Sequence, residues 1–279
     1  MITIGLTGWS DHETIAPDQK RKLPDYAGHF PVVELDTSFY AIPSEKNVQR
    51  WLALTPEEFQ FIPKAYGPMT THVRRPDETR SLDELFTLYL KAFRPMVESN
   101  KVKAFLFQFP PLFSCVRENV DYLRKVRELM GDLPIAIEFR HKSWFAEEFK
   151  EGTLQFLSDM HFINVVVDQP QTPDNSVPFV PVVTNTDLAF MRLHGRNYAG
   201  WLGDDAIDWR TFRTLYDYPE EELAFLKEAV LDLAKDAKDV TVIFNNNSGG
   251  HAAPNAKALQ KMLGLEFRGL APQQLNLFE

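Results

Sequence analysis

Cysteine is nearly absent from this sequence, which has one in 279 residues. Cys115 has no partner for an internal disulfide, so we expect a protein of a reducing compartment, the cytoplasm. Residues 1–9 lack the basic and apolar segments that open a secretory signal peptide. No apolar run approaches the roughly 20 residues that a membrane-spanning helix needs. These absences predict an intracellular protein that makes no contact with a membrane.

Positive charge is in deficit, with 30 Lys and Arg against 39 Asp and Glu and a net charge of −9. An acidic surface disfavours nonspecific binding to nucleic acid or anionic membranes, although it leaves room for a local basic pocket. Two common motifs are also missing. No G-x-G-x-x-G follows the first predicted strand, which disfavours a dinucleotide site in an open doubly wound sheet. No H-E-x-x-H is present, so the sequence predicts no compact zinc site.

The sequence does contain a regular alternation of short apolar strands and helical segments. Several strands are nearly continuous apolar runs, which is typical of parallel strands covered on both faces. Eight β/α units in a chain of this length favour closure into a single (β/α)8 TIM-type barrel of the α/β class over an open doubly wound sheet. We assign residues 1–268 to the barrel and 269–279 to a short C-terminal tail. The predicted strands are Ile2–Thr7, Val32–Asp36, Phe59–Lys64, Lys103–Phe109, Pro134–Phe139, Phe162–Asp168, Leu188–His194 and Val240–Asn246.

Long loops are expected after strands 3, 6 and 7. The segment between Asp168 and Leu188 holds four prolines, too many for a regular helix. The segment between Gly195 and Tyr218 is rich in aromatic residues, among them Trp201. Both segments leave the C-terminal end of a strand, where barrel enzymes place their active sites. They are therefore expected to form either a wall over such a site or plain connecting loops.

Polar residues recur on one side of several strands, opposite apolar neighbours. Side chains two residues apart in a strand share a face, and the apolar face must cover the helices, so the polar face must point to the barrel axis. Buried charges are costly unless they are paired, which leaves two interpretations: a self-neutralised ion-pair network or a ligand site. Charges from six strands favour the ligand site. The predicted ring at the C-terminal mouth is Glu34, Lys64, Gln108, Glu138, Arg140, Asp168, Arg192 and His194.

Short motifs spread in order over almost the whole chain carry a family resemblance. The sequence resembles the YecE-like family, domain of unknown function 72. The resemblance implies an eight-fold β/α barrel, and it implies no activity because none is assigned to the family. The motifs are Gly8-Trp9, Val33-Glu34, Ser38-Phe39-Tyr40, Trp51, Thr55-Pro56, Phe59-Gln60-Phe61, Lys64, Thr71-His72, Gln108-Phe109-Pro110-Pro111, Glu138-Phe139-Arg140-His141, Ser143-Trp144, Asp168, Arg192-Leu193-His194-Gly195, Phe244-Asn245-Asn246 and Asn255-Ala256.

The first functional hypothesis is an enzyme acting on an anionic small molecule such as a phosphate ester or sugar phosphate, because arginine and lysine at the strand ends match anionic oxygens. In this hypothesis Lys64, Arg140 and Arg192 hold the anion. Glu34 or Glu138 is the general base, and His194 or His141 is the general acid. Asp168 is a further catalytic candidate, and the reaction type stays open. Further substrate contacts are expected from Trp9, His72, Gln108, His141, Trp144, Asn245 and Asn246.

Two alternatives remain open at the same mouth. Glu34, Glu138, Asp168 and His194 are residue types that bind a divalent metal ion, although the interleaved cations oppose one. No cofactor is firmly implied by the sequence. The barrel is alternatively a binding protein without catalysis, in which aromatic residues stack on a sugar or a base. Those aromatics are Trp9, Tyr40, Trp144 and Trp201, for which packing in the core is the competing interpretation.

The C-terminal tail ends in a short motif of its own. Gln274, Leu275, Leu277 and Phe278 form Gln-Leu-x-Leu-Phe, which resembles the peptide by which bacterial replication and repair proteins dock on the DNA sliding clamp. Such a peptide inserts apolar side chains into a groove and hydrogen-bonds through glutamine. Docking would make the chain a clamp-associated protein of nucleic-acid processing, the second hypothesis. The competing interpretation is that Leu277 and Phe278 pack back onto the barrel.

Overall fold

The computed structural model of the chain describes residues 1–72, 80–173, 176–202 and 209–273. Eight parallel strands form its centre, one for each predicted strand and within two residues of the predicted bounds. They are β1 (Ile2–Thr7), β2 (Val32–Leu35), β3 (Gln60–Pro63), β4 (Phe105–Gln108), β5 (Ile135–Glu138), β6 (Phe162–Asp168), β7 (Leu188–Leu193) and β8 (Asp239–Phe244).

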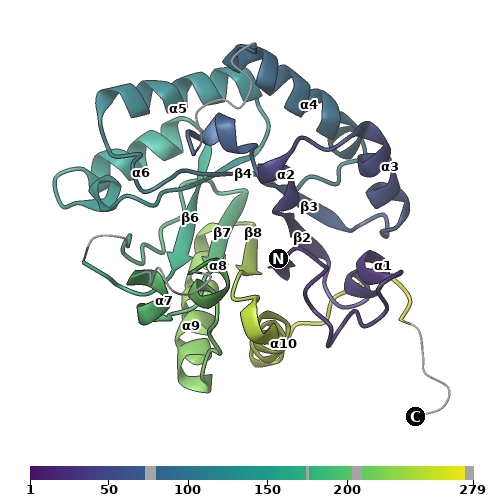
Figure 1. Cartoon of the computed structure of the whole chain (residues 1–279). Helices are drawn as coiled ribbons and strands as arrows, with labels where there is room; N and C mark the ends of the chain where they lie inside the picture. Colours follow the sequence, from purple (N-terminus) through teal and green to yellow (C-terminus); the bar gives the residue numbers. More distant parts are fainter. Residues whose placement is uncertain (73–79, 174–175, 203–208, 274–279) are drawn as a thin grey trace, which may run out of the picture.

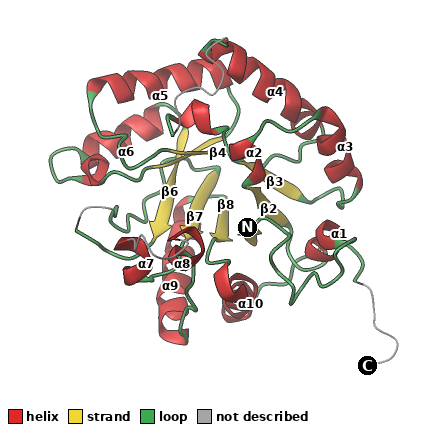
Figure 2. Cartoon of the chain, viewed as in Figure 1, coloured by secondary structure: helices red, strands yellow, loops and turns green. Residues whose placement is uncertain are grey.

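The strands close on themselves (Figure 2). Their hydrogen-bonded order is β3-β2-β1-β8-β7-β6-β5-β4. The remaining seam, between β3 and β4, is joined by backbone hydrogen bonds of 2.8 Å on both sides of Phe61 and by another from Ala65 N to Leu106 O. Closure leaves no exposed sheet edge, and it turns one face of every strand toward a common axis. The predicted TIM-type barrel is confirmed.

Helices form a ring outside the strands (Figure 1). The described part of the β6–β7 connection contains no helix, as its prolines predict. Within the described ranges, no helix combines the length and apolarity needed to cross a bilayer. The helices are α1 (Lys22–Ala27), α2 (Thr37–Tyr40), α3 (Glu45–Ala53), α4 (Leu82–Glu98), α5 (Arg117–Met130), α6 (Lys150–Asp159), α7 (Tyr198–Leu202), α8 (Trp209–Arg213), α9 (Glu220–Asp236) and α10 (Ala252–Met262), with short 3-10 turns at Gly67–Thr70, Lys142–Phe145 and Ser248–Gly250.

The barrel axis is filled by apolar side chains below the mouth. Inward-facing residues from β2 to β8, among them Val32, Ile62, Leu106, Phe190 and Ile243, form one buried cluster. A second, larger cluster lies between the strands and the helices and holds most of the buried phenylalanines. The interior is therefore packed, and polar groups on the axis are confined to its ends, as in other barrels of this type.

The sixth strand faces the opposite way from the prediction. In the β6–β7 pairing, Val167 stands opposite Arg192 and Asp168 stands opposite Leu193. Paired residues of parallel strands share a face, so Val167 points to the axis and Asp168 points outward. The prediction that Asp168 joins the ring at the mouth is wrong. The physical reason is that polar partners cover the outside of β6: the amide of Asn164, for example, donates to the carbonyls of Val180 and Val182.

The described part of the chain after α10 lies against α1. Ala271 N donates to Ala27 O at 2.9 Å, and the Gln273 amide donates to Gly28 O at 2.8 Å. Gln274, Leu275, Leu277 and Phe278 lie outside the described residues, so docking on a sliding clamp stays a prediction.

Close packing of β1 on β2 makes Gly5 a sensitive position. A Cβ there would lie 2.2 Å from the carbonyl oxygen of Val32, whereas a Cβ at Gly152 on α6 meets nothing within 4 Å. We predict that Gly5→Ala lowers the free energy of unfolding by about 1–3 kcal/mol through overpacking. Gly152→Ala is the control and should raise it by about 0.5–1 kcal/mol. Urea unfolding followed by circular dichroism measures both, and equal stability of Gly5→Ala and wild type would contradict the packing described.

Candidate active site at the C-terminal mouth

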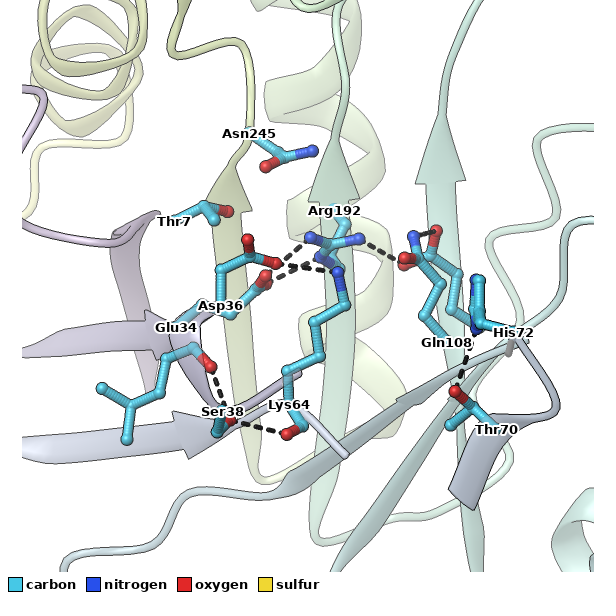
Figure 3. Close-up of polar contacts among 12 residues, drawn as sticks. Thr7, Glu34, Asp36, Ser38, Lys64, Thr70, His72, Gln108, Arg192 and Asn245 are labelled. Atoms are coloured by element: carbon cyan, nitrogen blue, oxygen red, sulfur yellow. Dashed lines mark hydrogen bonds and ion pairs between the residues drawn. The ribbon is translucent and has the colours of Figure 1, made fainter. Parts of the chain in front are cut away.

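Arg192 lies at the centre of the mouth and is 1% exposed. Its Nε and Nη2 donate to the two carboxylate oxygens of Glu34 on β2, each at 2.7 Å (Figure 3). Its Nη1 donates to Oε2 of Glu138 on β5 at 2.5 Å. One guanidinium from β7 thus joins two carboxylates from other strands. Charge-assisted and bidentate contacts of this kind are the strong class of protein hydrogen bonds, and they fix all three side chains.

Glu138 accepts hydrogen bonds from the remaining polar groups of the inner mouth. Its Oε1 accepts hydrogen bonds from Gln108 Nε2 at 2.7 Å, His194 Nε2 at 3.0 Å and Arg140 Nη1 at 3.3 Å. Burial opposes the charged form, but Arg192 and His194 outweigh it and hold the pKa of Glu138 well below its ordinary value. Glu138 is therefore ionised and serves as the fixed anion of the site.

Glu34 has the opposite tendency. Burial raises the pKa of this carboxyl, and the charges of Arg192 and Lys64 oppose that rise without cancelling it. The pKa of Glu34 is thus raised and the pKa of Glu138 is lowered. Such a divergence is the usual sign of different acid–base roles in a pair of carboxyl groups.

His194 is neutral in this site. Burial lowers the pKa of its imidazole to about 4, although Glu138 favours the protonated form. Asn245 Nδ2 lies 2.8 Å from His194 Nδ1, and an amide donor there leaves the ring proton on Nε2, where it is donated to Glu138. Asn245 therefore sets the tautomer of His194.

A second ion pair lies on the rim of the mouth. Lys64 Nζ contacts Asp36 Oδ1 at 2.8 Å (Figure 3). It also lies 4.8 Å from the ring centroid of Phe39. The carbonyl of Lys64 lies 2.6 Å from Ser38 Oγ and accepts from Tyr89 OH at 3.0 Å, which fixes the end of β3. The predicted site omits Asp36, although Asp36 shares the sequence parity of Glu34, and that parity was the available signal.

His72 shares the rim with Lys64. Its Nδ1 lies 2.9 Å from Thr70 Oγ1 in the turn after β3. Burial, followed by the positive charges of Lys64 and Arg140, lowers the pKa of His72 to about 4. The imidazole is therefore neutral, because burial and the two cations together outweigh the opposing charge of Glu138.

Aromatic side chains cover Arg140. The ring of Trp201 on α7 lies 4.7 Å from the Arg140 guanidinium and 3.4 Å from that of Arg213. Trp201 also approaches the ring of His194, at 6.0 Å between centroids. Arg140 keeps one atom unused, since its Nε has no hydrogen-bond partner among the described residues. The loop after β7 thus contributes part of a wall over the site.

A cavity of about 270 Å³ opens beside Glu34. It lies between the ends of β1, β2 and β8, and Trp9 is held at its edge by an edge-to-face contact with Trp51. The sequence-based site included Glu34 and Trp9 of this lining and missed Thr7 and Asn247. The lining residues are Thr7, Gly8, Trp9, Ser10, Asp11, Glu34, Leu35, Asp36, Thr37 and Asn247.

Three predicted contact residues have other partners. Trp144 is buried between Phe139 and Phe113, with ring centroids 4.1 and 5.7 Å away, and its Nε1 donates to Phe113 O. His141 pairs with Ser143 Oγ at 2.7 Å. Asn246 donates to Tyr216 O and Asn255 Oδ1. Each of these residues lies on the outward face of its strand or comes after the strand has ended, so each packs against other side chains of the protein. Tyr40, a further predicted aromatic contact, is exposed and packs against Phe39.

The predicted metal set is not assembled. The guanidinium of Arg192 lies between Glu34 and Glu138. Asp168 instead binds Arg196 through two nitrogens, at 2.7 and 3.0 Å, and accepts from Tyr218 OH at 2.7 Å outside the barrel. Over the described ranges, no group of three or more His, Cys, Asp or Glu is arranged to hold a metal ion. The proposal of Glu34, Glu138, Asp168 and His194 as ligands is therefore wrong as a set.

Comparison with known proteins assigns the chain to a family. A family model described as "Protein of unknown function DUF72" matches residues 3–276. The chain belongs to the DUF72 family. UPF0759 protein YunF of Bacillus subtilis (strain 168) is 47% identical over 282 residues, which cover all of both chains. UPF0759 protein YecE of Escherichia coli (strain K12) is 32% identical over 154 residues, 55% of this chain and 54% of YecE.

Solved structures of the DUF72 family share the whole fold. A family protein of Enterococcus faecalis V583 superposes with a TM-score of 0.94 at 46% identity, covering 99% of this chain and 100% of its own. Another, from Thermotoga maritima MSB8, has a TM-score of 0.80 at 33% identity and covers 95% and 100%. The barrel is thus a property of the family, and the family description assigns no reaction to it.

The neutral state of His194 predicts a loss of stability in acid. Its folded pKa of about 4 lies below the unfolded value of 6.5, so the unfolded chain binds this proton more readily. The contribution is complete above pH 6.5 and is lost as the pH falls toward 4, by about 3 kcal/mol. Urea unfolding at pH 7.0, 5.5 and 4.5 should show the loss, and His194→Gln should reduce its slope. A His194 ring that NMR finds protonated at pH 5.5 would contradict the assignment.

Proposed function

We propose that the protein is an enzyme that binds an anionic small molecule at the C-terminal mouth of the barrel and acts on it by general acid–base chemistry. The observation that carries the proposal is the unequal pairing of the cations. Arg192 uses three nitrogens on two buried carboxylates. Among the described residues, Arg140 has one ion pair, at 3.3 Å to Glu138, and Lys64 has one ion pair, to Asp36, whose side chain is 34% exposed.

Arg192 therefore has a different role from the one the sequence suggested. Each of its three guanidinium nitrogens is hydrogen-bonded to a buried carboxylate and its side chain is buried, so it orients Glu34 and Glu138 instead of holding the substrate. Lys64 and Arg140 remain to bind the anion, because each has one ion pair among the described residues and Arg140 Nε is left without a hydrogen-bond partner there, so donors remain for phosphate or carboxylate oxygens. Neutral His72, whose pKa is lowered by both of these cations, supplies a hydrogen-bonding nitrogen near them.

Glu34 is the proposed proton-transfer group. It borders the cavity, and burial raises its pKa above the ordinary carboxyl value, which suits a group that transfers a proton. Glu138 stays ionised and compensates Arg192 and Arg140, and His194 positions Glu138 through the Nε2 proton. In this scheme the two glutamates that the sequence offered as general base have different roles: Glu34 faces the substrate, and Glu138 does not.

An anion bound at the rim should be visible at His72. We predict that 20 mM inorganic phosphate, at ionic strength held constant with chloride, raises the His72 pKa by about one unit or more, because the anion offsets Lys64 and Arg140. NMR titration of the His72 ring measures this. Lys64→Met and Arg140→Met should each weaken the response, and Lys125→Met on the outer face of α5 is the matched control. An unchanged His72 titration in wild type would remove the support for an anion site.

Turnover should depend on Glu34. In a panel of phosphate monoesters and sugar phosphates, assayed for phosphate release and by NMR for isomerisation or elimination, we expect at least one converted compound. Glu34→Gln should lower its kcat by about 10²–10⁴ with a smaller change in KM, as expected for loss of a proton-transfer group. Glu118→Gln, on the exposed first turn of α5, controls for the substitution itself. Full activity in Glu34→Gln would refute the assigned role.

A further inference from the structure

The cavity beside Glu34 has a chemical character different from the cationic rim. Its lining contains no lysine or arginine, and three of its residues, Asp11, Glu34 and Asp36, carry carboxyl groups. It is therefore unsuited to a second anion. Its volume, about 270 Å³, lies at or below the small end of ligand pockets, which run from about 300 to 1,000 Å³. That size fits one small ring or a short chain and excludes a dinucleotide.

Two of the three carboxyl groups of this cavity are already neutralised, and the third belongs to Asp11, an exposed residue. Glu34 is paired with Arg192 and Asp36 is paired with Lys64. Neither needs a cationic ligand, so the cavity is not built for an ammonium group. A carboxylate oxygen with one bond keeps another lone pair free, and the best remaining donors for it are neutral hydroxyl groups.

Two further polar atoms lack partners in the same place. Thr7 is 6% exposed, and its Oγ1 has no hydrogen-bond partner among the described residues; the same holds for Asn247 Oδ1. In Figure 3 the Thr7 hydroxyl points inward, toward the carboxyl groups at the end of β2. Buried polar atoms are normally paired, and exceptions call for an explanation. A ligand hydroxyl, which both donates and accepts, satisfies Thr7 Oγ1 and Asn247 Oδ1 alike.

An aromatic surface completes the cavity. The indole of Trp9 lies in its lining and is fixed by Trp51 at 5.7 Å. An indole offers a flat apolar face to the C–H groups of a ring or chain, while the carboxylates and the Thr7 hydroxyl take its O–H groups. Asp36 belongs both to this cavity and to the ion pair with Lys64, so the cavity and the cationic rim adjoin.

From this arrangement we infer that the cavity binds the hydroxyl-bearing part of the substrate, so that the substrate is a polyhydroxylated compound of three to six carbons with one anionic group, such as a phosphorylated sugar or polyol. The inference rests on the proposed function, because Lys64 and Arg140 are taken to hold the anionic group. Thr7, Trp9 and Asn247 then determine specificity for the hydroxylated part.

Isothermal titration calorimetry with a matched set of probes tests this inference. The hydroxylated probes are glucose 6-phosphate, ribose 5-phosphate and 3-phosphoglycerate, and the comparison probes are phenyl phosphate, inorganic phosphate and glucose. We expect at least one hydroxylated phosphate to bind tenfold or more tighter than phenyl phosphate. Equal or tighter binding of phenyl phosphate, or no binding of any hydroxylated probe, overturns the inference.

Variants separate the cavity from the rim. Thr7→Val, which preserves shape, should weaken the best hydroxylated phosphate about fivefold or more and leave inorganic phosphate unchanged. Trp9→Leu should do the same and serves if Thr7→Val fails to fold. Thr3→Val is the matched control on the same face of β1, where the hydroxyl pairs with Thr241 Oγ1 at 2.9 Å. Unchanged affinity in both Thr7→Val and Trp9→Leu overturns the inference.

The same experiment distinguishes failure of the proposed anion site from failure of the hydroxyl-binding cavity. Lys64→Met should weaken both the hydroxylated phosphates and inorganic phosphate. If inorganic phosphate binds and responds to Lys64→Met but neither Thr7→Val nor Trp9→Leu affects any probe, the anion site stands and the hydroxyl cavity is wrong. If glucose binds and responds to Thr7→Val while no phosphate binds, the cavity stands, and both the anion site and the anionic group assigned to the substrate are wrong.

Discussion

The guanidinium of Arg192 stands inside the barrel between carboxylates from two other strands, and the arrangement of the mouth follows from it. Arg192 and Glu34 are 158 residues apart in the sequence, and Arg192 and Glu138 are 54 apart. Their side chains meet only when the strands have closed and when β2, β5 and β7 keep one register, since a slip of one residue would turn a charge toward the helices. Removing one partner would leave an uncompensated buried charge, so the three are mutually dependent.

One cation shared between two carboxylates cannot satisfy both equally. Glu138 gains Gln108, His194 and Arg140 and stays ionised, whereas Glu34 depends on Arg192 and on the more distant Lys64. The chemistry of the mouth is therefore asymmetric: an ionised, crowded carboxylate on one side and a carboxyl with a raised pKa beside a cavity on the other. Apolar side chains fill the axis underneath, so the low dielectric strengthens each of these effects.

The sequence predicts the barrel and much of the mouth because β2, β5 and β7 alternate cleanly. Val33 and Leu35 mark the outer face of β2 as clearly as Met191 and Leu193 mark that of β7. The alternation fails in β6, where Val165 and Val167 face the axis and Asp168 faces Arg196 and Tyr218 outside. The alternation of residues along a strand identifies two faces but does not say which one faces the axis. Where polar groups cover the outside of a strand, as in β6, the polar face is the outer one. The unequal pairing of Arg140, Lys64 and Arg192 depends on side-chain distances in the folded barrel, which the alternation of residue types does not encode.

The distribution of unsatisfied atoms separates the structural part of the mouth from the part assigned here to function. In the inner network, the three guanidinium nitrogens of Arg192 and the oxygens of Glu34 and Glu138 all have partners. Around it, Thr7 Oγ1, Arg140 Nε and Asn247 Oδ1 are buried without partners among the described residues. An unpaired buried polar group costs about 1–3 kcal/mol. Such atoms also occur away from the mouth, for example Lys22 Nζ and Arg127 Nε, so it is the grouping of the three at the mouth that favours a ligand. These three atoms lie at one opening, which also holds a carboxyl group of raised pKa. Unpaired polar atoms grouped in this way are expected at a ligand site, where binding takes precedence over stability.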